Sequence, residues 1–320
     1  MRVAVIGLGS AGERHARLLA ELGHEIAGHD PQASPPDGVE AAPSVADALT
    51  GADAAVIASP SSMHAEHALA AIESRVPALI EKPLAADAAG ARLVAEAAER
   101  AGILCGVAMN LRFHAGPMAL RRLIDQGDLG RLLFARASFG HDLRLWHPGT
   151  DYRLAYSARA ELGGGILLDA IHEVDELLWL LGPARSVSAE LAHVSDLEID
   201  VEDVALATVA FESGALGTLD LNFVEPSYRR TCLLVGEDGV ADWDWTRGSV
   251  IVRDAEGGVT EMPGASEPVD TYRAELSDFL AAVEGEGAPR TTLADGVSAM
   301  ELVEAAKRSS AEGARVDLPA

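Results

Sequence analysis

The first hundred residues alternate between short apolar runs and longer amphipathic segments. The apolar runs are too short for helices and end at glycine or polar residues, which is typical of strands buried on both faces of a sheet. We expect these strands at 2–6, 24–29, 54–58, 78–80 and 104–108, with helices at 11–22, 63–74 and 87–101. Such an alternation of strand and helix predicts an α/β fold with a doubly wound parallel sheet.

The pattern changes after about residue 116. Strands are expected there at 131–140, 185–193, 203–211, 215–224, 229–236 and 249–253, and helices at 117–126, 164–181, 270–284 and 294–312. Consecutive strands joined by short turns indicate an antiparallel sheet. We therefore predict a first domain over 1–116 and an α+β second domain over 117–320, whose sheet is open and mostly antiparallel.

A glycine-rich hexapeptide, Gly7-Leu8-Gly9-Ser10-Ala11-Gly12, follows the first expected strand and opens the first helix. Gly7 permits the tight turn, Gly9 lets a pyrophosphate approach the backbone, and Gly12 allows close packing of helix on strand. The helix amino terminus, including Ser10 and Ala11, offers N–H donors to the anion. In this strand–turn–helix context we predict a Rossmann domain that binds NAD. The alternative is a glycine turn that binds no ligand.

Asp30 ends the second expected strand, 18 residues after Gly12. Its carboxylate can accept hydrogen bonds from both ribose hydroxyls and would repel a 2′-phosphate. Pro31 and Gln32 bring no cation to offset that repulsion, so we expect NAD in preference to NADP. The alternative is that Asp30 only caps a turn.

Charge and cysteine content exclude several classes of partner. The chain has 50 acidic and 25 basic residues, a formal net charge of −25, and we find no basic patch. Nucleic acids and anionic membranes are therefore not expected partners. The cysteines, Cys105 and Cys232, are too few for a disulfide scaffold, and no apolar run reaches the roughly 18 residues of a membrane span. With a strand and a glycine turn already in the first nine residues, we expect no signal peptide and a cytoplasmic protein.

Lys82 is one of few lysines in the chain and follows an expected strand of the parallel sheet. The sequence has two lysines, Lys82 and Lys307, and the other residues of its Lys and Arg total are arginines. Lys82 lies between Glu81 and Pro83 directly after the expected strand 78–80, at the edge where open α/β sheets bind ligands. A compact ammonium at that edge can polarise an alcohol or carbonyl oxygen. The alternative is an exposed loop lysine.

Together with Ser59-Pro60-Ser61-Ser62-Met63-His64 and the segment 163–175, these motifs resemble the Gfo/Idh/MocA oxidoreductases, such as glucose–fructose oxidoreductase and inositol dehydrogenase. The resemblance covers nearly the whole chain and is strongest in 1–113 and 146–183. It implies that Lys82 sits beside the nicotinamide and the reacting carbon, with Glu81 also at the cofactor. It further implies that Ser59, Pro60 and His64 lie on the nicotinamide side. His64 alternatively packs locally in its helix.

The segment 163–175 resembles the family pattern GGGxLxDxGxHxxD, in which the aspartate and histidine face the substrate. The resemblance makes His172 the acid/base and Asp169 its neighbour on the substrate side; three residues apart on the expected helix, they would share a face. The family spacing is usually four, so either the glycine entry compensates or one residue has a lesser role, and we favour His172. Because no second cluster of ligands converges on them, we predict no metal.

Two further segments are candidates for substrate contacts. The resemblance places Asn110 and Arg112 at the border of the active site. Trp146, Tyr152 and Arg153 belong to an aromatic and polar segment suited to stacking on sugar faces and holding hydroxyl groups. The alternative for this segment is a structural loop between domains.

These observations predict an NAD-dependent oxidoreductase that transfers hydride between a secondary alcohol of a sugar, nucleotide-sugar or cyclitol and nicotinamide. His172 would serve as acid/base, and Lys82 would polarise the reacting oxygen. One alternative enzyme keeps NAD bound and uses transient oxidation for epimerisation or elimination. A third possibility is a non-catalytic dinucleotide-binding sensor. The resemblance also implies a homodimer or homotetramer.

Overall fold

The computed structural model of the chain describes residues 1–146 and 149–319. Two compact units are present: unit 1 comprises 1–110 and 269–300, and unit 2 comprises 111–268 and the chain from 301 onward. This division differs from the expected boundary at 116. It also groups 269–300, expected in the second domain, with the nucleotide-binding region.

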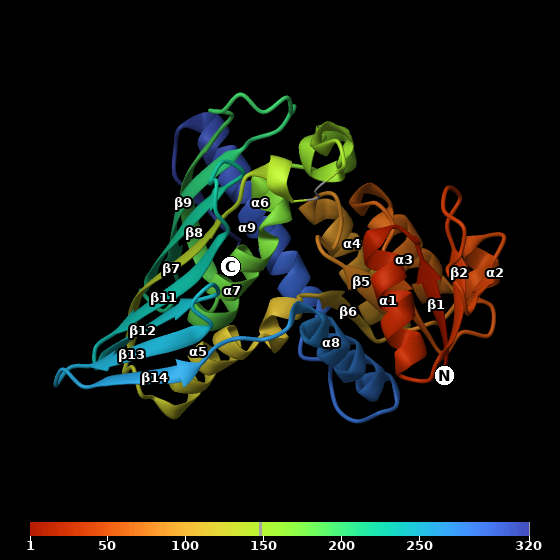
Figure 1. Cartoon of the computed structure of the whole chain (residues 1–320), viewed down its shortest axis with the longest axis horizontal. Helices are drawn as coiled ribbons and strands as arrows, with labels where there is room; N and C mark the ends of the chain where they lie inside the picture. Colours follow the sequence, from red (N-terminus) through yellow and green to blue (C-terminus); the bar gives the residue numbers. More distant parts are fainter. Residues whose placement is uncertain (147–148, 320) are drawn as a thin grey trace. The chain divides into compact units, whose positions relative to one another are not determined.

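Unit 1 is built on a six-stranded parallel sheet in the order β3-β2-β1-β4-β5-β6 (Figure 1). Its strands are β1 (Arg2–Ile6), β2 (Glu25–His29), β3 (Val39–Ala41), β4 (Ala54–Ile57), β5 (Ala78–Glu81) and β6 (Cys105–Ala108). Its helices are α1 (Ser10–Glu21), α2 (Val45–Leu49), α3 (His64–Glu73), α4 (Ala88–Ala101) and α8 (Pro268–Val283). The predicted doubly wound sheet is confirmed. The short elements β3 and α2 were not predicted, because three and five residues are too few to show a period.

Helix α8 joins unit 1 because its apolar side chains complete the core of that unit. Leu276, Phe279 and Leu280 are buried in one cluster with α1 residues such as Leu18 and with the apolar residues of β1. Burying large aliphatic and aromatic side chains stabilises a unit by about 1.5–3 kcal/mol each. The core contact, rather than position along the chain, therefore decides where 269–300 belongs.

The amino end of α1 lies directly against the ends of β1 and β4. A Cβ on Gly12 would stand 1.8 Å from the carbonyl oxygen of Gly7, so only glycine fits there. Gly7 has a φ of +91°, and a Cβ on it would stand 2.5 Å from the carbonyl oxygen of Ala58. The chain leaves β1 and β4 on opposite sides of the sheet, so this contact lies at the topological switch point.

A buried carboxylate then joins α1 to β5. An oxygen of Glu81 lies 2.7 Å from His15 Nε2 and 3.7 Å from a guanidinium nitrogen of Arg14, both on α1. Burial raises the pKa of Glu81, but the hydrogen bond from His15 and the positive charges of His15, Arg14 and Lys82 outweigh it and lower the pKa to about 2. The Arg14 guanidinium also stacks 3.9 Å from the Tyr272 ring of α8. This network fixes α1 beside the strand that carries Lys82.

Unit 2 is built on a nine-stranded sheet in the order β14-β13-β12-β11-β7-β10-β9-β8-β15. Its strands are β7 (Leu132–Gly140), β8 (Ala184–Ala192), β9 (Val204–Phe211), β10 (Leu216–Asn222), β11 (Arg229–Gly236), β12 (Gly239–Asp244), β13 (Ser249–Asp254), β14 (Val259–Pro263) and β15 (Val316–Asp317). Its helices are α5 (Ala115–Gln126), α6 (Ile166–Asp169) and α7 (Ile171–Leu181), and α9 (Leu293–Glu312) begins in unit 1 and ends in unit 2. Among the described residues of this sheet, β7 and β10 form the one parallel pair, so the predicted mostly antiparallel sheet is confirmed.

Helices α5 and α7 pack on one face of this sheet, and no helix in the described residues covers the outer face of β8, β9 and β10 (Figure 1). The strands alternate accordingly, and in β9 every second residue from Ala205 to Phe211 is buried. Strands β12, β14 and β15 were not predicted, because their sequences mix acidic residues, glycine or proline with few apolar positions.

The helix predicted over 164–181 is in fact two helices. Ala170, with φ −89° and ψ 31°, separates α6 from α7. The backbone N–H of Ile166 donates to the carbonyl of Glu202, and that of Leu167 to its carboxylate, so a neighbouring loop anchors α6 at its own angle. Asp169 and His172 stand on either side of the break, which corrects the expectation that one regular helix face carries both.

We expect the substitution Glu81→Gln to destabilise the folded chain near pH 7 by about 3 kcal/mol, because a carboxylate held at a pKa of about 2 stabilises the fold only while it is ionised. This contribution is complete above the ordinary pKa of glutamate. It disappears as the pH falls from about 4.5 towards 2, so wild type and variant should converge in acid. Denaturant unfolding at a series of pH values measures the difference. Glu96→Gln, which removes an exposed ion pair with Arg100, is the control and should change little.

Candidate active site

The glycine loop of unit 1 is shaped to receive a dinucleotide. Gly9 caps α1 without any side-chain hydrogen bond, and a Cβ placed on it would have no atom within 4 Å. The first helical hydrogen bond runs from Glu13 to Gly9, so the N–H groups of Ser10, Ala11 and Gly12 precede the helical ladder. An open backbone surface beside a helix amino terminus is what a pyrophosphate requires, and these residues fit NAD.

Asp30, at the end of β2, holds the loop in place. Its carboxylate accepts hydrogen bonds from the backbone N–H groups of Leu8 at 2.8 Å, Gln32 at 2.7 Å and Ala33 at 2.9 Å. Burial opposes ionisation, but these three donors outweigh it and lower the pKa of Asp30. A negative charge therefore stands beside the glycine loop. Asp30 thus caps the backbone N–H groups of the turn that follows β2 and of Leu8. Its contact with a ribose stays a prediction.

Lys82 follows β5 at the same edge of the parallel sheet as the glycine loop. The strands β1, β4 and β5 are neighbours in register, so their carboxyl ends bring together Gly7, Ser59 and Lys82 within unit 1. The backbone N–H of Lys82 donates to Glu81 at 3.1 Å. Three segments that the sequence separates by many residues thus form one edge.

His64 braces two of these loops. Its Nδ1 lies 2.7 Å from the carbonyl of Pro83 and its Nε2 2.7 Å from the carbonyl of Ser59. Burial lowers its pKa. The Ser59 hydroxyl in turn lies 2.9 Å from His67, while Pro60 is exposed. The contacts of His64 match the local-packing alternative, in which it positions the loops rather than touching the cofactor.

Glu81 was predicted to contact the cofactor, and its side chain contacts basic residues of α1. It is 8% exposed, and its carboxylate faces His15 and Arg14 on α1. A buried carboxylate committed to two basic groups is a support for the loop. The side chain of Glu81 therefore supports the loop, and the cofactor contact expected for this residue stays a prediction.

Asn110 and Arg112 were predicted to border the substrate, and both are buried, with 7% and 4% exposure. The Asn110 amide donates to the Thr271 hydroxyl at 2.8 Å within unit 1. Arg112 donates to both oxygens of Asp175 within unit 2, at 2.9 and 2.6 Å. Both side chains are thus held by protein partners, and their contacts with a substrate stay predictions.

The acid/base candidates lie in unit 2, around the break between α6 and α7. Asp169 and His172 are 6% and 8% exposed. The hydroxyl of Tyr156 donates to Asp169, and Tyr156 itself is 43% exposed. Sequence reasoning did not single out Tyr156, although it belongs to the aromatic stretch before the glycine run. Its hydrogen bond holds one carboxylate oxygen of Asp169 in place.

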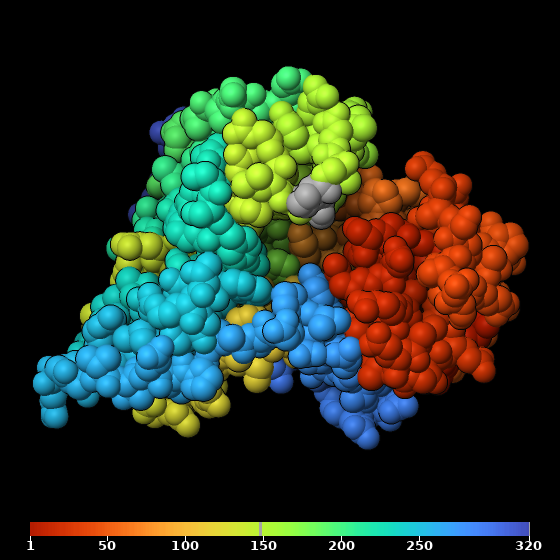
Figure 2. Space-filling view, in the orientation of Figure 1, coloured from red at the N-terminus to blue at the C-terminus, as the bar shows by residue number. Residues whose placement is uncertain are grey.

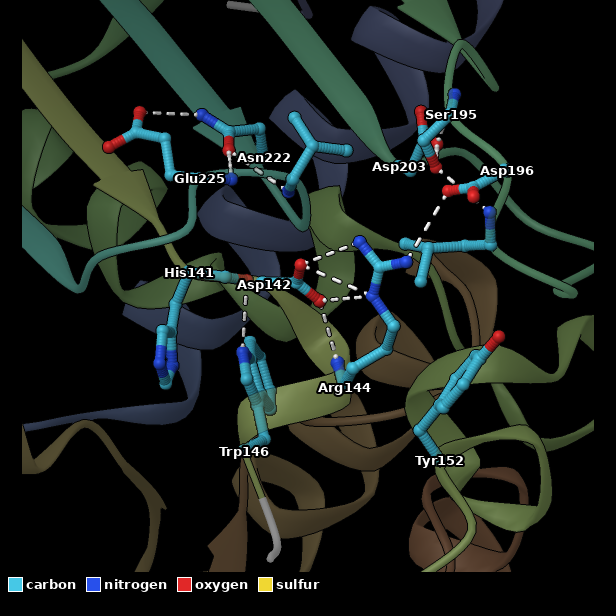
Figure 3. Close-up of polar contacts among 12 residues, drawn as sticks. His141, Asp142, Arg144, Trp146, Tyr152, Ser195, Asp196, Asp203, Asn222 and Glu225 are labelled. Atoms are coloured by element: carbon cyan, nitrogen blue, oxygen red, sulfur yellow. Dashed lines mark hydrogen bonds and ion pairs between the residues drawn. The ribbon is translucent and has the colours of Figure 1, made fainter.

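The predicted sugar-binding segment divides between two clusters, and its residues His147 and Pro148 lie outside the described residues. The Trp146 indole donates to the backbone carbonyl of His141 at 3.1 Å, and it lies beside the imidazole ring of His141 (Figure 3). The Tyr152 hydroxyl instead accepts from the backbone of Glu198, whose carboxylate binds Arg153 at 2.9 Å. Figure 2 shows this part of the chain on the surface of unit 2, beside the loop that carries Glu198.

The described residues contain neither a cluster of metal-ligating side chains nor a helix that could span a membrane. Within residues 1–146 and 149–319, no three His, Cys, Asp or Glu side chains are grouped so that they would hold a metal ion. No helix of the same residues combines the length and the apolar character needed to cross a membrane.

Comparison with known proteins places each unit in a family. Residues 1–109 match the family model described as an oxidoreductase family with an NAD-binding Rossmann fold, and residues 118–242 match the GFO/IDH/MocA C-terminal domain. These ranges include the glycine loop, Lys82 and His172. The NAD-binding Rossmann domain predicted from the sequence is confirmed.

Individual relatives agree with the family models. The chain is 30% identical to 1,5-anhydro-D-fructose reductase of Ensifer adhaerens, over 83% of this chain and 80% of that protein. It is 30% identical to inositol 2-dehydrogenase 2 of Paenarthrobacter aurescens, over 95% and 94%. A levoglucosan dehydrogenase solved with NADH and L-sorbose shares the fold, with a TM-score of 0.88, 23% identity and coverage of 100% and 99%. The chain belongs to the GFO/IDH/MocA family of oxidoreductases.

Proposed function

We propose that this protein oxidises a secondary alcohol of a sugar or cyclitol, or reduces the corresponding ketone, with NAD as the redox partner. The observation that carries the proposal is the edge of the unit 1 sheet, where the glycine loop and Lys82 follow neighbouring parallel strands. A nucleotide site and an ammonium group at one sheet edge suit hydride transfer to or from a polarised oxygen.

The class of substrate is supported by the relatives. Those with at least 30% identity are named for reactions on 1,5-anhydro-D-fructose and inositol, which are polyhydroxylated rings. The aromatic and hydroxyl-binding groups of unit 2 suit such rings, because aromatic faces pack on the C–H faces of sugars.

Different residues of this chain would bind the cofactor, polarise the substrate and transfer the proton. The bound nicotinamide supplies the hydride acceptor. The N–H groups of Ser10, Ala11 and Gly12 hold the pyrophosphate, and Lys82 polarises the reacting oxygen. His172 accepts the hydroxyl proton as the C–H bond breaks with its electron pair, and returns that proton in the reverse direction. Asp169, held by Tyr156, positions a substrate hydroxyl. No residue serves as a metal ligand in this proposal.

We propose a preference for NAD over NADP, based on Asp30. Its carboxylate is kept ionised by three backbone donors and stands at the end of β2. A 2′-phosphate placed there would face a negative charge.

We also propose a homodimer or homotetramer, with a second copy of this chain as the partner of the outer face of the nine-stranded sheet. Leu206 and Leu216 are each 48% exposed, and neither belongs to the side covered by α7. Exposed apolar side chains on a sheet face that no described helix covers suit an interface between copies of a chain. A cytoplasmic location is proposed as well, since the two cysteines are free thiols.

The main test is an assay of NAD reduction against a panel of sugars, nucleotide sugars and inositols. We expect NADH to accumulate with at least one polyol, and the absorbance of reduced nicotinamide measures it. Product formed without NADH accumulation would identify the alternative in which tightly held NAD is oxidised and reduced in turn. Binding of NAD with no product from any sugar would favour a sensor.

His172→Ala should reduce kcat by at least 100-fold, because general acid–base catalysis contributes roughly 10²–10⁴-fold. The dissociation constant for NADH, measured by fluorescence, should change less than threefold, since the glycine loop is untouched. His24→Ala, at a histidine near the amino terminus, is the matched control and should retain full activity. Undiminished turnover by the His172 variant would contradict its role.

Asp30→Asn should weaken NAD binding and narrow the preference over NADP by at least tenfold, because it removes the charge that opposes the 2′-phosphate. Titration of both cofactors into wild type and variant measures the ratio of dissociation constants. Asp37→Asn, in the following loop, should leave that ratio unchanged. Equal affinity of the wild type for the two cofactors would refute the assignment.

A further inference from the structure

Unit 2 gathers aromatic rings at one end of its sheet, on the face that α7 covers. We call the rings of Phe139, His141, Trp146, Tyr228 and Trp245 the aromatic surface. The centroid distances are 5.8 Å for Phe139–Trp146 and for Phe139–Tyr228, 5.5 Å for His141–Tyr228, and 5.9 Å for Tyr228–Trp245. Aromatic residues make up only 4% of the sequence, so this concentration is unusual for the chain.

The surface adjoins the candidate acid/base through one ion pair. Arg230 lies on β11, with its guanidinium 4.6 Å from the Phe139 ring and 5.7 Å from the Trp245 ring. Its Nε lies 2.7 Å from Glu173, the residue that follows His172 on α7. The side chain of Glu173 is fully buried and that of Arg230 is 13% exposed. Arg230 is thus paired with a buried carboxylate.

The neighbouring arginines are matched as well. Arg144 lies between Asp142 and Asp196 (Figure 3), and its guanidinium nitrogens are 2.7 and 3.5 Å from their carboxylate oxygens. Arg153 similarly binds Asp151 at 2.8 Å and Glu198 at 2.9 Å. Two carboxylates for each arginine leave these clusters with a negative net charge.

The histidines of this region add no positive charge. His114 stacks on Trp245 at 4.4 Å, and burial, with the charge of Arg230, lowers its pKa to about 4. Burial also lowers the pKa of His141. At the aromatic surface, an anionic group would therefore meet aromatic faces, neutral imidazoles and paired guanidiniums, and displacing a buried carboxylate from its arginine is costly.

We propose that the aromatic surface selects an uncharged polyhydroxylated substrate, and that Glu173 determines this specificity by neutralising Arg230. The inference rests on the proposed function and narrows it, since uronates and nucleotide sugars are excluded. Ring faces supply stacking for the C–H groups of a neutral sugar or cyclitol. The charge of Arg230, which could otherwise attract a carboxylate or phosphate, is opposed by the buried carboxylate of Glu173.

The experiment compares neutral and anionic sugars with the full-length protein and NAD. In the wild type, kcat/KM for the better of D-glucose and myo-inositol should exceed that for D-glucuronate at least tenfold. Glu173→Gln removes the carboxylate that pairs with Arg230, so the ratio should fall at least tenfold in that variant. Glu237→Gln removes an exposed ion pair with Arg131 at the opposite end of β11, away from the aromatic surface, and should keep the wild-type ratio.

A double variant, Glu173→Gln with Arg230→Gln, guards against misfolding of the single one, because it removes both buried charges together. It should retain the neutral preference. Equal use of D-glucuronate by the wild type, or a ratio unmoved by Glu173→Gln in a folded protein, would overturn the proposal. If the single variant does not fold, a double variant that has lost the neutral preference would overturn it too.

Quenching of tryptophan fluorescence gives the same comparison as dissociation constants and needs no turnover. Tighter binding of the neutral sugars with no NADH formed would support the aromatic surface while refuting the proposed oxidation. NADH formed equally from neutral and anionic sugars would support the proposed oxidation and refute selection by the aromatic surface. Absence of quenching by every sugar would show that the surface binds no carbohydrate and would end the proposal.

Discussion

The packing of α1 on the parallel sheet is the constraint on which unit 1 depends. Gly12 meets the carbonyl of Gly7 so closely that no Cβ fits, and this contact aims the amino end of α1 across the end of β1. One turn later, His15 and Arg14 bind the buried carboxylate of Glu81 on β5. Steric contact and ion pairing thus fix the nucleotide loop and Lys82 on one rigid frame. Because the frame is rigid, the backbone donors of the loop need little reorganisation when an anion binds.

Unit 2 relies on buried charge in a comparable way. Helix α7 carries three buried acidic residues, and two of them face arginines: Glu173 with Arg230 and Asp175 with Arg112. Burial and the nearby charge of Glu173 raise the pKa of Glu176 well above its usual value. Buried pairs contribute little net stability, but breaking one is expensive, so they enforce a single arrangement of helix on sheet. The same pairs fix the acid/base candidates and remove positive charge from the aromatic surface.

The sequence predicted most of the regular structure where a strong period or a glycine signal existed. All five strands expected in the first domain are present, and the second sheet is mostly antiparallel. The failures have physical causes. Helix α8 leaves the second domain because Leu276 and Phe279 complete the core of unit 1. The predicted helix 164–181 breaks at Ala170 because the loop at Glu202 holds its first turn, which hydrophobic periodicity does not register.

What the sequence determined by itself is local: the glycine spacing that forms the loop, the acidic residue at the end of β2, and the lysine after β5. Each depends on the conformation of a few neighbouring residues, so its motif is readable along the chain. Only the tertiary structure decided which distant partners the buried charged side chains take. Arg112 finds Asp175 at a separation of 63 residues, and Glu81 finds His15 at 66. No local period encodes such pairings, because burial makes the choice: a charge removed from water must meet its opposite, and the packing of distant elements decides which one is near.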